Sequence, residues 1–271
     1  VQYTSGSTAS PRGVMLTHGS LLACSRAIRD GFAYSSEDRG VIWLPPYHDM
    51  GLIGGIVQPL YGGVSVTLKS PLHFLQRPAR WLAAISRYRA RVSGGPNFAY
   101  DLCARKVTAE ERRGLDLRCW EVAFNGAEPV REGTLARFAE TFEPCGFSRD
   151  AFLPCYGLAE ATLMVSGRDR TRPVAIAQVD AVALERDLVI EAAVGSRGSR
   201  TLVGCGPSIP EHGIEIVDPA SLARCPEGRV GEIWVKGPCV AQGYWGRPEE
   251  SAHAFGAFLA ETGEGPFLRT G

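Results

Sequence analysis

The run Tyr3-Thr-Ser-Gly-Ser-Thr-Ala-Ser-Pro-Arg-Gly-Val-Met-Leu-Thr-His18 combines hydroxyl side chains, two glycines and one arginine in a single loop. Gly6 and Gly13 can adopt backbone angles closed to other residues, which lets amide N–H groups turn toward an anion. The hydroxyls and the Arg12 guanidinium are donors suited to phosphate. Thr17 is typical of a helix N-cap. The run therefore predicts a phosphate-binding loop, although a Ser/Thr/Gly-rich linker without a ligand has a similar composition.

Outward from this loop, short apolar runs alternate with helical patterns up to about residue 167. The patterns predict strands at 41–44, 64–68 and 122–124 and helices at 17–33, 77–90 and 130–143. Such alternation indicates an α/β fold with a mainly parallel sheet covered by helices, whose ligands bind beyond the carboxyl ends of the strands. The loops expected to carry the site each follow a strand: 4–13, 45–51, 93–97, 125–128 and 156–160.

The pattern changes at about residue 168 to short β segments, at 200–203, 214–217 and 231–235. These predict a smaller, β-rich and barrel-like subdomain. The expected organisation is thus an α/β subdomain over 1–167 and a β-rich subdomain over 168–271.

Composition excludes several classes of protein. The 271 residues are 45% hydrophobic and 21% charged, as in soluble globular proteins, and the formal net charge is zero. No overall field therefore recruits nucleic acid. No apolar run approaches the roughly 20 residues that span a bilayer, and no signal peptide is visible. The eight cysteines form no Cys-x-x-Cys pair, which favours free thiols in a reducing cytoplasm.

Three further turns carry candidate residues. Tyr156 and Gly157 offer a flat aromatic face and room for a ring to approach it, and Glu160 is placed either to cap a following helix or to hold a divalent cation. Asn125-Gly-Ala-Glu-Pro129 alone indicates only a turn. His48 lies beside Asp49 at the end of a predicted strand, which favours a site role more than a lone histidine would.

Eight motifs follow one another along the chain: Tyr-Thr-Ser-Gly-Ser-Thr, Pro-Arg-Gly, Tyr-His-Asp-Met-Gly, Asn-Gly-Ala-Glu-Pro, Tyr-Gly-Leu-Ala-Glu, Gly-Glu-Ile-Trp-Val-Lys-Gly, Gly-Tyr-Trp and Leu-Arg-Thr-Gly. Together and in this order, they resemble the motifs of the adenylate-forming superfamily. That superfamily contains acyl-CoA synthetases, luciferases and the adenylation domains of peptide synthetases. Several features look most like its fatty acyl-AMP ligase branch. They are the segments 43–55, 74–82, 95–103 and 124–129, the Arg12 of Pro-Arg-Gly, and the long connection from 160 to 204.

This resemblance implies an enzyme that joins a fatty acid and ATP into an acyl-adenylate with Mg²⁺ and releases pyrophosphate. The acyl group would then pass to the phosphopantetheine arm of an acyl carrier protein, in lipid or polyketide assembly. The implied catalytic residues are Thr8, His48 and Glu160, with Glu160 binding the metal. The implied nucleotide- and phosphate-binding residues are Thr4, Ser5, Gly6, Ser7, Thr8, Arg12, Gly13, Asn125, Gly126, Ala127, Glu128, Cys155, Tyr156, Gly157, Leu158 and Ala159. The implied acyl-binding residues are His48, Met50, Gly51, Gly55, Gly95, Asn97 and Phe98.

The sequence also departs from the family pattern. It stops at Gly271, before the aspartate that holds the ribose, and none of Lys69, Lys106 and Lys236 stands in the motif of the family's catalytic lysine. We therefore expect the central part of the large N-terminal domain, inactive by itself. A segment at about 171–201 is expected to be a small β insertion of the kind associated with poor use of CoA.

Three alternatives remain open. A long-chain acyl-CoA ligase of the same fold would be favoured by a shorter connection between 160 and 204. An amino-acid adenylation domain would need an acidic residue placed to hold an ammonium group, and none is evident. The third alternative is a nucleotide- or acyl-binding fragment without catalysis.

Overall fold

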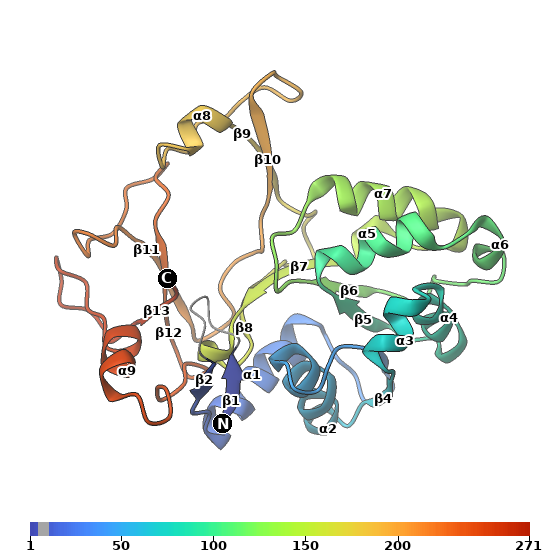
Figure 1. Cartoon of the computed structure of the whole chain (residues 1–271), viewed down its shortest axis with the longest axis horizontal. Helices are drawn as coiled ribbons and strands as arrows, with labels where there is room; N and C mark the ends of the chain where they lie inside the picture. The colour runs from blue at the N-terminus through green and yellow to red at the C-terminus, as the bar shows by residue number, and fades with distance from the viewer. Residues whose placement is uncertain (5–10) are drawn as a thin grey trace.

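The computed structural model of this chain describes residues 1–4 and 11–271 (Figure 1). The strands are β1 (Gln2–Thr4), β2 (Arg12–Val14), β3 (Arg39–Ile42), β4 (Ser65–Leu68), β5 (Val92–Gly95), β6 (Val122–Asn125), β7 (Phe152–Gly157), β8 (Met164–Gly167), β9 (Ile176–Asp180), β10 (Ser199–Val203), β11 (Gly213–Val217), β12 (Glu232–Lys236) and β13 (Leu268–Arg269). The α-helices are α1 (His18–Gly31), α2 (Gln58–Gly62), α3 (Pro71–Gln76), α4 (Ala79–Tyr88), α5 (Asn97–Lys106), α6 (Ala109–Arg112), α7 (Glu132–Phe142), α8 (Ala181–Leu184) and α9 (Pro248–Phe255). A π-helix, η1 (Met50–Val57), and the 3₁₀ helices η2 (Glu143–Cys145), η3 (Arg149–Ala151) and η4 (Ala159–Ala161) complete the elements.

The central sheet has six strands in the order β4-β3-β5-β6-β7-β8. All neighbours pair in parallel except β7 and β8, which are antiparallel. Helices α5 and α7 lie on one face of this sheet, and α1 and α2 lie on the other (Figure 1). The predicted α/β class with a mainly parallel, helix-covered sheet is therefore confirmed.

Helix α1 shows why the sequence pattern was informative. Thr17 caps it, since its side chain accepts the backbone N–H of Ser20 while the Ser20 hydroxyl lies 3.0 Å from the backbone nitrogen of Thr17. Its buried face includes Cys24 and Ile28, one turn apart. The helix ends before Ala33, whose φ of 49° lies in the left-handed region.

Two expectations about the site loops need correction. β1 pairs with β2 as an antiparallel hairpin, so the loop of residues 4–13 does not follow a strand of the central sheet. Glu160 begins no α-helix, because the short η4 ends at Ala161 and the next residue, Thr162, has a φ of 68° that turns the chain into β8. A helix-cap role for Glu160 therefore has no α-helix to act on.

Two other loops begin later than predicted. Ser93 to Gly95 belong to β5, and Tyr156 and Gly157 belong to β7. A buried strand and the turn that follows it can share the same small and apolar residues, so the sequence alone does not locate the strand end.

The C-terminal part is rich in β structure, as predicted. Its strands form an antiparallel pair, β9–β10, and an antiparallel sheet of three strands, β11-β12-β13. These are separate small sheets rather than a closed barrel. The pair β9–β10 projects from the rest of the molecule in Figure 1 and overlaps the segment at about 171–201 that was expected to be an insertion.

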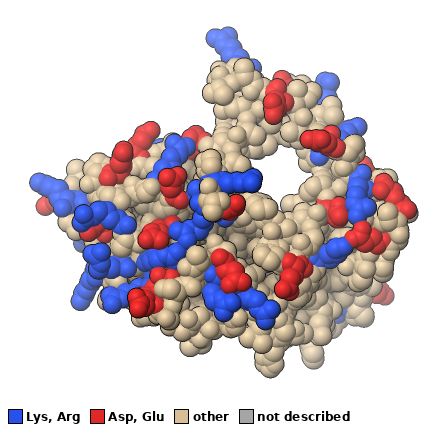
Figure 2. Space-filling model, turned by 180° about the vertical axis from the view of Figure 1, so that it is seen from behind, with Lys and Arg blue, Asp and Glu red and all other residues tan. Residues whose placement is uncertain are grey.

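The core under the central sheet is aromatic. Trp81, Tyr100, Trp120, Phe138 and Phe152 are buried and meet mainly edge to face. All eight cysteines are free thiols. Positive and negative side chains are intermixed on the face shown in Figure 2. No helix in the described ranges is long and apolar enough to cross a membrane.

Candidate functional site

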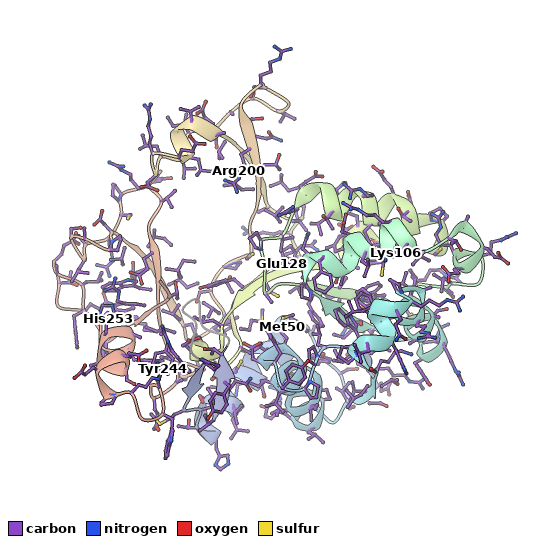
Figure 3. The ribbon with its side chains drawn as sticks, in the orientation of Figure 1. Met50, Lys106, Glu128, Arg200, Tyr244 and His253 are labelled. Atoms are coloured by element: carbon purple, nitrogen blue, oxygen red, sulfur yellow. The ribbon has the colours of Figure 1, made fainter. Side chains whose placement is uncertain are left out.

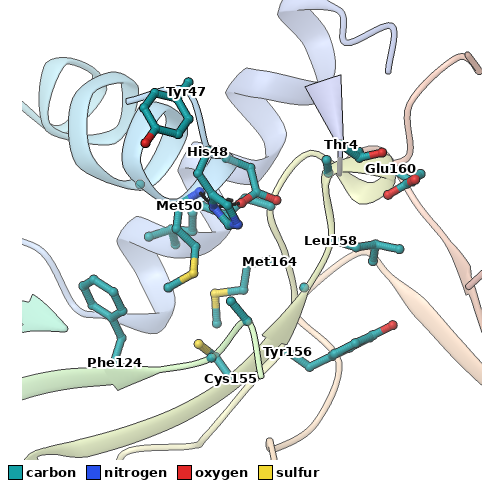
Figure 4. Close-up of a pocket in the computed structure, with 18 of the residues that line it drawn as sticks. Thr4, Tyr47, His48, Met50, Phe124, Cys155, Tyr156, Leu158, Glu160 and Met164 are labelled. Carbon is teal, nitrogen blue, oxygen red and sulfur yellow. Dashed lines mark hydrogen bonds and ion pairs between the residues drawn. The ribbon is translucent and has the colours of Figure 1, made fainter. Parts of the chain in front are cut away.

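A cavity of about 610 Å³ opens beside the ends of β6 and β7 (Figure 4). Its walls come from the β1–β2 hairpin, α1, the turn before η1, and the segments around β6, β7 and η4. The lining residues are Tyr3, Thr4, Pro11, Ile28, Phe32, Tyr34, Tyr47, His48, Asp49, Met50, Gly54, Phe124, Gly126, Ala127, Cys155, Tyr156, Gly157, Leu158, Ala159, Glu160, Leu163 and Met164. The position agrees with the expectation that ligands bind at the carboxyl ends of parallel strands.

One edge of the cavity is polar and charged. The hydroxyl of Tyr244 donates to Glu160 Oε1 over 2.9 Å and accepts from Nη1 of Arg12 over 3.3 Å. The Arg12 guanidinium also lies over the Tyr244 ring and forms an ion pair with Glu250 at 3.2 Å. Burial and the neighbouring Glu160 carboxylate raise the pKa of Tyr244 to about 12. The hydroxyl thus stays protonated and orients the Glu160 carboxylate.

His48 and Asp49 lie on a second side, in the turn before η1. His48 Nδ1 is 2.6 Å from Asp49 Oδ1, and the backbone N–H of Met50 donates to the same oxygen over 2.6 Å. The hydrogen bond to Asp49 raises the pKa of His48 above its usual value, although burial opposes this. His48 therefore carries a proton to higher pH than an isolated histidine.

A third side is formed where β6 and β7 end. Gly126 must be a glycine, because a Cβ there would lie 2.9 Å from both the carbonyl oxygen and Sγ of Cys155. Gly157 is equally constrained, since a Cβ would lie 1.7 Å from the Leu163 carbonyl oxygen. Tyr156 projects its ring along this side (Figure 4). The two close approaches leave a shallow wall on which a flat ring can rest.

The remainder of the cavity is apolar. It is lined by Ile28 of α1, Phe32 directly after α1, Phe124 of β6, Leu163 before β8 and Met164 at the start of β8. Burial raises the pKa of Cys155 in this wall to about 12, so its thiol is neutral. The sequence analysis did not identify this part of the site, because its residues are ordinary core positions of a helix and strands. The apolar face of α1 was the one available signal.

The cavity brings together many of the predicted residues. Thr4, His48, Met50, Gly126, Ala127, Cys155, Tyr156, Gly157, Leu158, Ala159 and Glu160 line it. Arg12 reaches it through Tyr244, and Gly13 lies in β2 with its carbonyl bonded to the Trp245 N–H over 2.7 Å. Ser5, Gly6, Ser7 and Thr8 lie outside the described residues.

Other predicted residues have structural partners away from the cavity lining. The Glu128 carboxylate accepts the backbone N–H of Phe98 over 2.6 Å, at the start of α5 (Figure 3). Asn97 is bonded to Thr134 and to the backbone of Arg131.

Three predicted glycines of the acyl site are likewise packed against other elements. A Cβ on Gly51 would lie 1.9 Å from the Pro45 carbonyl oxygen, and one on Gly55 would lie 2.7 Å from the Ile42 side chain. A Cβ on Gly95 would lie 2.7 Å from the Trp43 ring. Gly54, between the first two, is the glycine of η1 that lines the cavity.

Two polar groups at the site lack partners in the described part of the chain. The amide of Asn125 is buried at the end of β6, and neither its nitrogen nor its oxygen has a hydrogen-bond partner there. The buried hydroxyl oxygen of Thr4 likewise has no hydrogen-bond partner in the described residues. Unpaired buried polar atoms are rare and costly, and a polar ligand can satisfy them.

Among residues 1–4 and 11–271, no group of three or more His, Cys, Asp and Glu side chains is arranged to hold a metal ion. Glu160 is therefore a single carboxylate at the cavity edge. That donor set suits Mg²⁺ bound together with waters and substrate phosphates, rather than in an all-protein cage.

The AMP-binding enzyme family matches residues 1–245 of the chain. The medium-chain-fatty-acid–[acyl-carrier-protein] ligase JamA of Moorena producens is 49% identical over 273 residues, which cover 100% of this chain and 46% of the relative. A second relative, named as the fatty-acid–CoA ligase fadD21 of Mycobacterium bovis, is 43% identical over 286 residues, which cover 100% of this chain and 48% of the relative.

A solved structure of similar fold is the fatty acyl-adenylate ligase from Legionella pneumophila in complex with acyl adenylate and pyrophosphate. It has a TM-score of 0.95 and 45% identity, with 100% of this chain and 47% of that chain covered. The chain thus spans about half the length of the relatives that it matches.

Proposed function

The chain belongs to the AMP-binding enzyme family, and we propose that it forms the ATP- and fatty-acid-binding part of an enzyme that makes acyl-adenylate. The observation that carries this proposal is the composition of the cavity. One cavity combines a charged edge at Glu160, a histidine, His48, whose pKa Asp49 raises, and an apolar half beside α1 and β8. An acyl chain needs an apolar surface, its carboxylate needs a positive or hydrogen-bonding partner, and the phosphates of a nucleotide need a polar, charged edge.

In the proposed reaction, a carboxylate oxygen of the fatty acid attacks the α-phosphorus of ATP. The new bond forms as the bond from that phosphorus to the bridging oxygen breaks, and pyrophosphate leaves. Two anions must meet, so the reaction depends mainly on positioning and charge neutralisation. The hydrogen bond to Asp49 favours the protonated form of His48, which attracts the carboxylate. Arg12, Thr4 and the loop that joins β1 to β2 hold phosphates.

The nucleotide base is assigned to the wall formed by Gly126, Ala127, Tyr156 and Gly157. The close backbone approaches at Gly126 and Gly157 support this assignment, because they leave room for a flat ring beside Tyr156. Glu160 is the residue proposed to hold Mg²⁺, and Tyr244 orients its carboxylate. The ion, when bound, would neutralise phosphate charge.

For the acyl acceptor, we propose the phosphopantetheine arm of an acyl carrier protein. The relative JamA is named for this acceptor, and the projecting β9–β10 segment agrees with the insertion expected in fatty acyl-AMP ligases. The second candidate is a CoA ligase, which the name of fadD21 favours. We also propose that the protein is cytoplasmic, which the free cysteines support.

The test is to incubate the full-length protein with ATP, Mg²⁺ and a fatty acid and to measure pyrophosphate release. Holo-acyl carrier protein, apo-carrier without the arm, and CoA are then supplied in parallel. We expect fatty-acid-dependent pyrophosphate release and transfer to the holo-carrier alone. Efficient acyl-CoA formation would favour the second candidate, and nucleotide binding without pyrophosphate release would reduce the protein to a binding module.

A further inference from the structure

We propose that Phe32, Tyr34 and Phe124 form a rigid aromatic end wall of the cavity and set the greatest length of the fatty acid that the site accepts. This inference rests on the proposed function, because it takes the apolar half of the cavity as the acyl site. It assigns chain-length selection chiefly to the C-terminal end of α1.

The three rings form one continuous surface. The Phe32 and Tyr34 rings have centroids 5.8 Å apart and planes 26° apart. The Phe32 and Phe124 rings have centroids 6.1 Å apart and planes 23° apart. All three residues line the cavity, and Phe32 and Phe124 are only 7% and 9% exposed. The wall is therefore part of the packed core and not a loose surface group.

The wall lies opposite the reacting end of the cavity. In Figure 4, Phe124 is on the far side of the pocket from Thr4 and Glu160, with Met50, Met164 and Cys155 between. A fatty acid whose carboxylate lies between His48 and the charged edge would therefore run past these sulfur-containing side chains toward the aromatic rings. Its terminal methyl group would meet the wall.

The end of α1 holds the first two rings in place. The Phe32 N–H donates to the Ile28 carbonyl over 2.9 Å, and the Tyr34 N–H reaches back to the Arg29 carbonyl over 2.9 Å. Ala33, between the two aromatic residues, takes the left-handed conformation with φ of 49°. This helix-ending turn brings Phe32 and Tyr34 to the same side.

A cluster of charges supports the wall from behind. The Phe32 carbonyl oxygen accepts from Arg91 over 3.1 Å and from Arg170 over 3.2 Å. Arg91 pairs with Asp38 and Glu121 at 2.9 Å each, and Arg170 lies 3.6 Å from Glu121. The two hydrogen bonds anchor the backbone that carries the Phe32 ring, which therefore moves only if they break. The charges therefore make the aromatic wall a firm stop.

The experiment measures dissociation constants of straight-chain fatty acids of increasing length for the full-length protein and its variants. Acyl-adenylate formation is measured in parallel. For the wild type we expect affinity to rise with each methylene and then to fall once the chain exceeds the cavity. Phe32→Ala should move this break to longer chains, with about a fourfold gain in affinity for each methylene newly buried. Phe32→Trp should move it to shorter chains.

Ratios of affinity between long and short acids are compared, because partial unfolding of a variant lowers all lengths by the same factor. Phe142→Leu is the matched control, since Phe142 is fully buried in α7 and lines no part of the cavity. Its length profile should match the wild type.

The outcomes separate this inference from the proposed function. If Phe32→Ala leaves the dependence of affinity on chain length unchanged, the end-wall proposal is wrong, whether or not acyl-adenylate still forms. A profile that shifts as expected without acyl-adenylate formation supports the wall and contradicts the proposed activity. Absence of fatty-acid binding overturns both.

Discussion

At the scale of single residues, the site is organised by a directed pair of hydrogen bonds. Arg12 donates to the Tyr244 hydroxyl, which in turn donates to Glu160. Both bonds involve a charged partner and strengthen each other. Tyr244 comes from the Gly-Tyr-Trp motif, more than eighty positions after Glu160 in the chain, so the C-terminal part of the sequence contributes directly to the charged edge.

The first prediction concerns Glu160→Gln. We expect acyl-adenylate formation by the full-length protein to fall by about 10²–10³, because the amide lacks the charge that Mg²⁺ requires. The unfolding temperature should stay the same, since the amide oxygen can still accept the Tyr244 hydrogen bond. Pyrophosphate release and thermal unfolding measure the two effects.

Glu132→Gln is the control for this substitution, because it makes the same change in a carboxylate that pairs with Arg149 at 2.9 Å and lies outside the cavity at Glu160. It should leave the rate unchanged. A lower unfolding temperature with a normal rate for Glu160→Gln would show that this carboxylate is structural.

The second prediction concerns the proton on His48. Asp49→Asn should lower the midpoint of the His48 titration followed by NMR, because the hydrogen bond to Asp49 is the main cause of the raised pKa. A pKa raised on folding stabilises the folded state fully below about pH 6.5, and this contribution is lost as the pH rises through the folded pKa. Its size is limited because the His48 side chain is half exposed.

Asp30→Asn serves as the control, since Asp30 pairs with Arg29 on the surface of α1 and should not affect His48. Equal His48 midpoints in the wild type and in Asp49→Asn would contradict the assignment of the shift to Asp49.

At the scale of elements, helices with one apolar face were predicted well. The helix expected at 77–90 is α4, and that expected at 130–143 is α7. Each of these helices buries one side, so its apolar residues recur every three or four positions, and this period can be recognised in the sequence. The π-helix η1 was not predicted, because its apolar residues and glycines follow one another without a period.

The same reasoning explains what the sequence could reveal of the site. Residues at strand ends and beyond, such as Tyr156 and Glu160, stand in recognisable motifs and do line the cavity. The pairing of β1 with β2 and the aromatic wall depend on contacts between distant segments. Neither Phe32 nor Phe124 differs in the sequence from any other core phenylalanine, so only the fold reveals that they meet.

The third prediction compares two glycines of η1. Gly51→Ala should destabilise the protein by about 2–3 kcal/mol, because its Cβ would lie 1.9 Å from the Pro45 carbonyl oxygen and the backbone must shift. Gly54→Ala should leave stability unchanged or slightly higher, since its nearest neighbour is the Leu163 side chain at 3.4 Å and alanine favours helix. Urea unfolding of both variants measures the difference, and equal stabilities would contradict the close packing of Gly51.

At the scale of the whole molecule, the segment that contains β9, α8 and β10 is set apart from the central sheet. Figure 2 shows the molecule hollowed between this segment and the rest, and Arg200 lies on it far from Met50 in Figure 3. The segment packs against α7 through β10. It also contacts the loop before β12, where the Val189 N–H donates to the Gly228 carbonyl over 2.8 Å and the Val230 N–H donates to the Asp187 carbonyl over 2.9 Å. The segment therefore connects the side of the central sheet with the loop before β12, and none of its residues lines the cavity.

The fourth prediction concerns removal of this segment. Ala175 and Gly204 stand side by side at its base, since the Gly204 N–H donates to the Ala175 carbonyl over 2.9 Å. Residues 176–203 can therefore be deleted and the ends joined through a short glycine linker. We expect the full-length variant to keep acyl-adenylate formation, because no deleted residue lines the main cavity. Acyl-CoA formation should rise well above that of the wild type, if the insertion limits access of CoA to the adenylate.

Both products are assayed for the wild type and the deletion variant, with thermal unfolding as a check on folding. A substitution of Val189 by proline is the companion variant, because it removes the N–H that bonds Gly228 and loosens the connection to the loop before β12 while the rest of the segment stays. An intermediate rise in acyl-CoA would place the effect in this connection itself. An unchanged acyl-CoA rate in the deletion variant would remove the insertion as the cause, and efficient use of CoA by the wild type would contradict the fatty acyl-AMP ligase assignment.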